Sequence, residues 1–126
     1  MSASASISFD DHSGSHIGVT AGSRGTWTIT YTAGPDGIAP GGGIRLFRVD
    51  HKFWLGMVKQ TDDPQAEDYC TVQTDGECSV DLTVADYYKH LNIAQATIGD
   101  APLREGESIT IRIGDTSGGG PPASAP

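Results

Sequence analysis

The stretch TWTITYT, from Thr26 to Thr32, decides the fold class of this chain. Its apolar residues Trp27, Ile29 and Tyr31 alternate with threonines, and residues two apart lie on the same face of a strand. The stretch is therefore expected to form a half-buried β-strand with its apolar side toward a core. The stretches SITIRI (108–113) and SVDLTV (79–84) alternate in the same way.

Weaker strand patterns complete a β-rich chain. They lie at 7–9, 17–21, 44–49, 69–74 and 92–98, and turn signals such as GPDG, GDAP and REGE separate them. About eight short strands at near-regular spacing predict an all-β, antiparallel β-sandwich that is immunoglobulin-like or jelly-roll-like. The one helix expected is a turn or two within VADYYKHL (84–91), where Asp86 is suited to cap it.

The length of 126 residues fits one domain, and 17 glycines with 37% hydrophobic residues suit a turn-rich β protein. We expect the sandwich to occupy residues 1–115. The final segment TSGGGPPASAP (116–126) has the composition of a flexible tail.

The charge balance excludes two classes of partner. Sixteen acidic residues against eight basic ones give a net charge of −8, which repels nucleic acid and anionic membrane surfaces. The chain contains no run of about 18 apolar residues, so no membrane insertion is expected. Another protein or further copies of the chain remain as the expected partners.

The two cysteines bear on the compartment. Cys70 and Cys78 flank TVQTDGE, in which Asp75-Gly76 signals a hairpin turn. In neither hairpin register are they directly opposite, whereas a disulfide needs their Cβ atoms about 3.8 Å apart. Irregular loop geometry would still close the bond, so a disulfide and two thiols both remain open. A disulfide or a removed signal peptide would imply an extracytoplasmic protein, and a complete chain a cytoplasmic one.

The glycine-rich stretch GPDGIAPGGG (34–43) raises the question of a phosphate cradle. A P-loop needs G-x-x-x-x-G-K-[ST] leading into a helix, but here no Lys follows and the next residues, IRLF, are β-like. We therefore interpret the stretch as a crossover between two sheets, with Pro35 at the first corner of a turn.

The sharpest polar cluster is DDHSGSH (10–16). His12 and His16, with Asp10 beside them, offer imidazole and carboxylate ligands for a divalent metal, and a further ligand would come from His51, His90 or Asp115. Short polar runs of this kind are usually solvated loops, and we favour that interpretation. For Asp115, in GDTSGGG (114–120), we favour an Asx turn after the last strand. No bound cofactor is expected otherwise.

Aromatic residues supply a second candidate site. Trp54 lies in the poorly alternating run HKFWLGM (51–57), and Tyr87 and Tyr88 lie in DYYKH. Such side chains either fill a core or stack on a sugar ring or a neighbouring subunit.

Three stretches in order carry a family resemblance: GTWTITYTAGPDGIAPGGGIRL (25–46), W…KQTDDP…DYCTV (54–72) and PLREGESITIRIGDTSGGGP (102–121). Together they resemble the opening β-sandwich of uncharacterised bacterial proteins that carry a metal-dependent hydrolase domain related to the PHP phosphoesterases. In that family the metal site belongs to the following domain. The resemblance therefore implies a sandwich scaffold and assigns no catalytic residue to this chain.

The sequence thus favours a non-catalytic β-sandwich module for binding or self-assembly. No G-x-S-x-G or comparable catalytic spacing occurs, so we favour a protein without enzymatic activity, although the sequence leaves the question open. The alternatives are an accessory domain of a metal-dependent hydrolase, or a small metal-binding or carbohydrate-binding protein. Unpaired strand edges would provide the route to assembly, because they are templates for strand addition.

Overall fold

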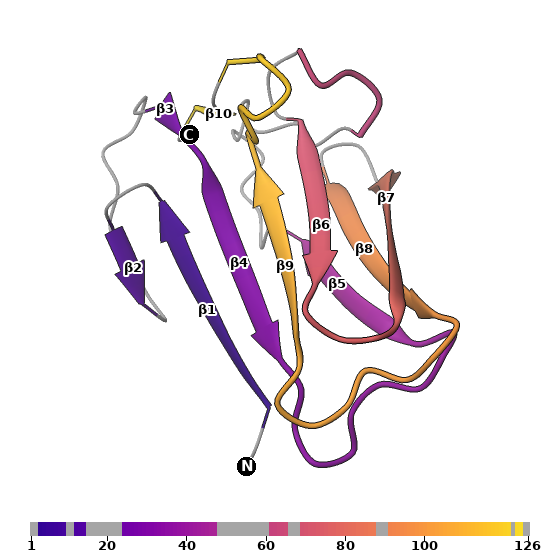
Figure 1. Ribbon diagram of the computed structural model, residues 1–126. Coiled ribbons are helices and arrows are strands. Elements are labelled where there is room, and N and C mark those ends of the chain that lie inside the picture. The colour runs from indigo at the N-terminus through magenta and orange to yellow at the C-terminus, as the bar shows by residue number, and fades with distance from the viewer. Residues whose placement is uncertain are drawn as a thin grey trace.

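The computed structural model describes residues 3–9, 12–14, 24–47, 61–65, 69–87, 91–121 and 123–124. These residues form ten β-strands and no helix (Figure 1). The strands are β1 (Ser4–Phe9), β2 (His12–Gly14), β3 (Arg24–Gly25), β4 (Trp27–Thr32), β5 (Gly43–Phe47), β6 (Cys70–Thr74), β7 (Ser79–Tyr87), β8 (Leu91–Gly99), β9 (Ser108–Ile113) and β10 (Ala123–Ser124). No helix long and apolar enough to span a membrane occurs among them.

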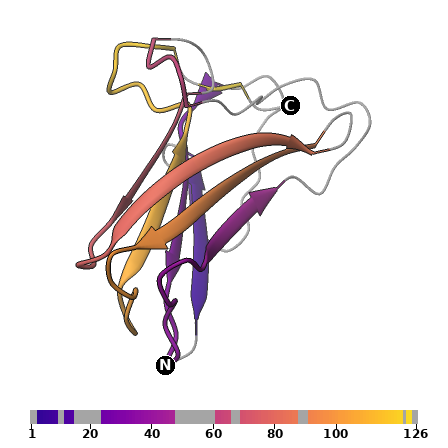
Figure 2. The same ribbon diagram turned by 90° about the vertical axis from the view of Figure 1, so that its right-hand side faces the viewer.

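Two larger antiparallel sheets form the sandwich. The first has the order β2-β1-β4-β9-β6, and the second has the order β5-β8-β7. A third, two-stranded sheet pairs β10 with β3. Figure 2 shows the strands of the second sheet running steeply across those of the first. The predicted all-β antiparallel sandwich is confirmed.

The strand order separates the two predicted topologies. β4 pairs with β9 and the next strand, β5, pairs with β8, so the pairs are nested along the chain. In an immunoglobulin sandwich the last strand joins the sheet that lacks the first strand, whereas here β9, the last strand of the two larger sheets, pairs with β4 and β6 in the first sheet. The order therefore fits the jelly-roll alternative.

The core lies between the two sheets, and β9 is its central strand. Ile109, Ile111 and Ile113 are 0%, 0% and 3% exposed. Alternation therefore placed the apolar face of β9 correctly. The other members of the core cluster are Ala33, Cys70, Cys78, Ala96, Ile98 and Leu103.

The glycine-rich stretch is a crossover, as predicted, because it joins β4 of the first sheet to β5 of the second. The N–H of Gly37 donates to the carbonyl of Gly34 at 3.0 Å, which closes a turn with Pro35 at its first corner. Gly37 has a φ of +58°, and the carbonyl oxygen of Leu103 lies where a Cβ atom would be. Glycine is therefore required by both conformation and space.

Two local predictions are wrong. The helix expected at 84–91 is absent from its described residues, because β7 continues to Tyr87 and pairs residue by residue with β8. The hairpin expected at Asp75-Gly76 is also absent. β6 pairs with β9 and β7 pairs with β8, so the segment between them crosses from one sheet to the other.

The segment predicted as a flexible tail takes defined structure in its described part. The N–H of Gly119 donates to the carbonyl of Thr116 at 2.9 Å, and β10 pairs with β3. Gly118 lies so close to Pro64 that an added Cβ would approach the Pro64 ring to 2.6 Å. The flexibility of the tail itself stays a prediction.

Candidate functional site

The second sheet ends in strand β7, the longest strand at a sheet edge. It pairs with β8 along all nine residues, and no other described strand pairs with it. Figure 2 views the molecule from this side, with β7 in front. We call the outer side of β7 the open edge.

Hydrogen bonds of β8 show which β7 residues direct their backbone outward. The N–H of Ile98 donates to the carbonyl of Gly42, and the carbonyl of Ile98 accepts from Gly41, both at 2.8 Å. The backbone of Ile98 therefore points toward β5. Neighbouring residues of a strand point to opposite sides, so Thr97 and Gln95 point toward β7 and bond its Asp81 and Thr83.

It follows that Val80, Leu82 and Val84 direct their N–H and C=O groups away from β8, to the open edge. Their side chains lie on the inner face, where Val80 and Leu82 pack against the core. All three are only partly buried, whereas Ala94, Ala96 and Ile98 of the neighbouring β8 are buried. The core is thus incompletely covered along β7.

The opposite end of the same sheet is β5. Ile44 and Leu46 are partly buried and pack against the core, and Arg45 between them is exposed. Since the even-numbered residues of β8 point toward β5, their partners Ile44 and Leu46 bond β8. The backbone of Arg45 therefore points outward, and its Nε donates to Gln95 Oε1 at 3.0 Å across the outer face.

The first sheet ends in the shorter strand β6. The N–H of Asp75 donates to the carbonyl of Ser108 at 3.4 Å, and that of Gly114 donates to the carbonyl of Tyr69 at 2.9 Å. Odd-numbered residues of β6 therefore bond β9, and only Cys70, Val72 and Thr74 present backbone groups outward. Short edge strands of this kind resist strand addition better than long ones.

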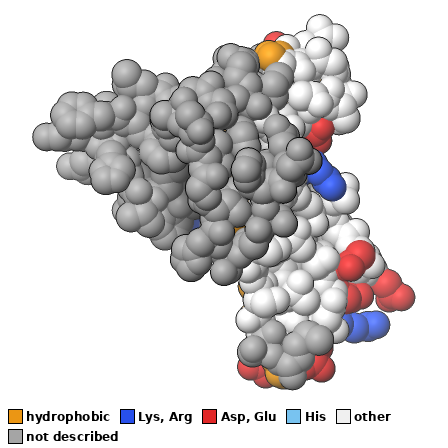
Figure 3. Space-filling view, turned by 90° about the vertical axis from the view of Figure 1, so that its left-hand side faces the viewer, with side chains coloured by type: hydrophobic (Ala, Val, Ile, Leu, Met, Phe, Trp, Pro, Cys, Tyr) orange, Lys and Arg blue, Asp and Glu red, His pale blue; other side chains and the backbone are white. Residues whose placement is uncertain are grey.

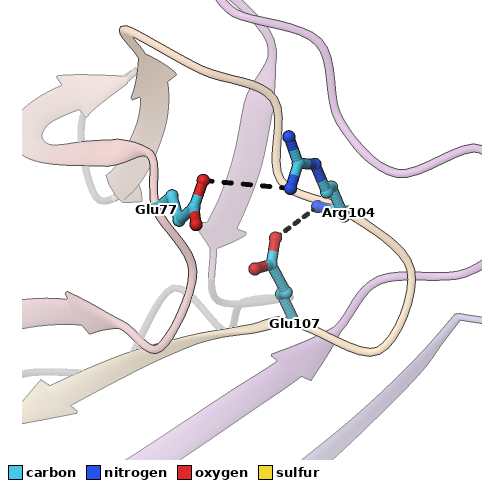
Figure 4. A network of polar contacts seen from close by, with 3 residues as sticks. All are labelled: Glu77, Arg104 and Glu107. Atoms are coloured by element: carbon cyan, nitrogen blue, oxygen red, sulfur yellow. Dashed lines mark hydrogen bonds and ion pairs between the residues drawn. The ribbon is translucent and has the colours of Figure 1, made fainter.

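Acidic residues surround the start of β7. Asp81 is exposed on its outer face, and Asp75 and Glu77 precede the strand. Figure 4 shows Arg104 beside two of the acids in this region: its Nη1 lies 3.8 Å from Glu77 Oε2, and its N–H donates to Glu107 Oε1 at 2.7 Å. Figure 3 shows acidic side chains gathering at this end of the described surface.

Asp75 fastens the beginning of β9 to the turn between β6 and β7. Its Oδ1 accepts from the N–H of Ser108 at 2.7 Å, and its Oδ2 accepts from the Ser108 hydroxyl at 3.2 Å. The backbone hydrogen bond, more than any other cause, holds the pKa of Asp75 below its ordinary value of 3.8.

Asp115 fastens the end of β9 to β6, through a hydrogen bond with Thr71. Partial burial raises the pKa of this carboxyl, but hydrogen bonds from Thr71 Oγ1 at 2.6 Å and from the N–H of Ser117 at 2.9 Å outweigh that effect. The charge of Arg112 adds to the lowering, and the pKa of Asp115 falls below 3.8. The Asx turn predicted for this residue is confirmed.

The outer face of the first sheet carries mostly uncharged polar side chains, which we call the hydroxyl face. Residues paired across β1, β4, β9 and β6 form two rows. The rows are Ser6–Thr30–Thr110–Gln73 and Ser8–Thr28–Arg112–Thr71. Such side chains are suited to hydrogen-bond an uncharged partner.

The predicted metal and aromatic residues fall mostly outside the described residues, as Asp10, His16, Trp54 and Tyr88 do. His12 opens β2 opposite Phe9, and Tyr87 ends β7 opposite Leu91. Within the described part of the chain, no three His, Cys, Asp or Glu residues are grouped to hold a metal ion.

Of the two alternatives left open for the cysteines, the disulfide is not formed, and Cys70 and Cys78 are both buried thiols. Cys70 begins β6 and Cys78 follows the turn after its end, so the length of the strand separates them. Four residue steps of about 3.3 Å place Cys70 about 13 Å from Thr74, the end of β6 from which the chain turns toward Cys78.

No family model, no curated protein and no solved structure matches this chain. The resemblance to the sandwich of the PHP-related proteins therefore stays a prediction. Sequence reasoning also missed the role of β7, since SVDLTV alternates like an interior strand. SVDLTVADY also lacks the Lys and Pro that natural edge strands often contain, so its composition did not indicate an edge.

Proposed function

We propose that this chain is a non-catalytic β-sandwich module that binds a partner, another protein or a further copy of itself, by adding a strand to β7. The open edge carries the proposal, because it combines outward-directed backbone groups with half-buried apolar side chains. An added strand would satisfy the backbone groups and cover Val80, Leu82 and Val84. The family resemblance supports the same view, since it implies a scaffold without catalytic residues.

The test compares two substitutions at one position of the open edge. Val84→Pro removes an outward N–H and leaves the bonds to β8 intact, whereas Val84→Ala removes side-chain bulk and keeps the N–H. Association is measured by native mass spectrometry. In parallel, nine-residue peptides are added and NMR follows the amide signals of β7. In each peptide valine alternates with one polar residue, which is lysine, glutamate or threonine.

We expect that an oligomer, or a peptide that shifts the β7 amide signals, is seen with Val84→Ala and is lost with Val84→Pro. A wild-type protein that stays monomeric while no peptide affects β7 would contradict the proposal. Association that is equal in the two folded variants would also contradict it.

The hydroxyl face supports a second candidate function, the binding of an uncharged oligosaccharide. Two rows of hydroxyl and amide groups cross four strands there, and Arg112 is their only charged member. Titration with neutral oligosaccharides should then show binding that the double substitution Thr30→Val and Thr110→Val abolishes. Binding that survives in the double variant would place the ligand elsewhere.

A further inference from the structure

We infer that the strand added to β7 is β5 of a second copy of this chain, running parallel to β7, so that the second sheet continues from copy to copy. The inference rests on the proposed function and names its partner. The two end strands of the sheet carry it, because they are complementary in charge and in the direction of their backbone groups.

The charges favour β5 over the other end strands of the two larger sheets. Asp81 is an exposed charged residue of β7, and SVDLTVADY contains no basic residue that would neutralise it if β7 paired with itself. Like charges brought together across strands are destabilising. The edge strands β2 and β6, HSG and CTVQT, contain no Lys or Arg, whereas GIRLF of β5 contains Arg45.

The backbone directions select a parallel arrangement. In a parallel pair, a residue whose backbone points to the partner lies opposite a residue whose backbone points away. Leu82 points to the open edge, so it would lie opposite Ile44 or Leu46 of the second copy, with all three side chains on the inner face. Arg45 also points outward, so it would lie opposite Asp81 or Thr83 on the outer face.

An antiparallel pair would not match the faces. In an antiparallel pair, the backbone groups of two opposite residues both point toward the partner strand or both point away. Leu82 would then lie opposite Arg45, and Asp81 would lie opposite Ile44 or Leu46, so apolar and charged side chains would share a face. Parallel addition also agrees with the sheet itself, since β5 and β7 are both antiparallel to β8 and thus run in the same direction.

The assembly would be open-ended. Each copy offers one β7 edge and one β5 edge, so the contact is heterologous and a further copy adds at each end. The guanidinium of Arg45, already bonded through Nε to Gln95, has four further N–H donors for the Asp81 carboxylate.

The experiment is a charge exchange between the two edges. Asp81→Arg and Arg45→Asp are prepared singly and combined, and their folding is checked by circular dichroism. Association is measured by light scattering and native mass spectrometry over a range of protein concentration. Each single variant should associate roughly tenfold more weakly than wild type, because an attractive cross-strand pair becomes a like-charge pair.

Rescue distinguishes this contact from a general loss of structure. Mixing the two single variants should restore association through alternating copies, and the combined variant should assemble like wild type. Wild-type oligomers that neither single variant weakens would overturn the inference, as would a mixture that stays monomeric.

The outcome also separates this inference from the proposed function. If a peptide shifts the β7 amides while wild type stays monomeric at every concentration, strand addition stands and the second copy is the wrong occupant. If neither a peptide nor a second copy engages β7, both proposals fail.

Discussion

Strands β9 and β7 have nearly the same sequence pattern, SITIRI and SVDLTV, and very different surroundings. β9 is paired on both sides, and its isoleucines are at most 3% exposed. β7 is paired on one side among the described strands, and its apolar side chains are half-buried. Alternation thus reports which face of a strand is apolar and not where the strand lies in its sheet. Similar apolar residues fill the core in β9 and, in β7, lie beside an edge that no other described strand pairs with.

The largest effect should come from emptying the inner face of β9. We expect Ile111→Ala to lower the free energy of unfolding by about 2–5 kcal/mol, as for other fully buried aliphatic side chains. Leu82→Ala on β7 should cost only about 1–2 kcal/mol, because part of its side chain already faces water. Urea unfolding followed by tryptophan fluorescence measures both. Equal losses would show that β7 is covered as well as β9.

Proline substitutions at two neighbouring positions of β7 should show which backbone N–H groups point to β8 and which point outward. Thr83→Pro removes an N–H that bonds β8 and should cost about 3 kcal/mol, whereas Val84→Pro removes one that points outward and should cost about 1 kcal/mol. The midpoint of thermal unfolding shows which of the two proline variants is the less stable. If Val84→Pro is the more damaging substitution, the assignment of the open edge is wrong.

The smallest effect concerns the two carboxylates that fasten the ends of β9. Because Asp75 and Asp115 both have lowered pKa values, they stabilise the fold above pH 3.8, and this stabilisation is lost as the pH falls through their folded-state pKa values. Asp115→Asn should therefore flatten the fall in stability below about pH 4. Thr71→Val removes the hydroxyl group that donates to Asp115, so it should also make the fall in stability at low pH less steep.

The pH test has a matched control on β7. Asp81 is exposed and accepts no hydrogen bond comparable to those of Asp115, as far as the described residues show. Urea unfolding of Asp81→Asn between pH 2 and pH 7, at a protein concentration too low for association, is the control, because this substitution removes a carboxylate and keeps the Thr71–Asp115 contact. A curve flattened as much by Asp81→Asn as by Asp115→Asn would mean that the Thr71–Asp115 contact is not the source of the effect.

The sequence was informative where a local rule decides the structure. Alternation identified β4, β9 and the start of β7, the GPDG sequence identified the turn at Pro35, and the Asx turn of Asp115 followed from its place after a strand. In each case the residues that determine the structure are close together in the chain.

The sequence was misleading where distant pairing decides. The DG signal at Asp75 predicted a hairpin, but β6 found a better partner in β9, whose buried isoleucines lie opposite Cys70, Val72 and Thr74. Pairing with β8 likewise extended β7 through the expected helix to Tyr87. The place of β7 at a sheet edge could not be predicted, because it depends on pairing between distant strands, and among the described strands only β8 pairs with β7.

Amide hydrogen exchange of β7, resolved by residue with NMR, tests the central claim most directly. In the monomeric protein, the account predicts slow exchange at Asp81 and Thr83, which bond β8, and fast exchange at Leu82 and Val84, which point outward. Raising the protein concentration until copies associate should then slow Leu82 and Val84. Equal protection of all four amides in the monomer would contradict the account, because it would mean that β7 already has a partner on both sides.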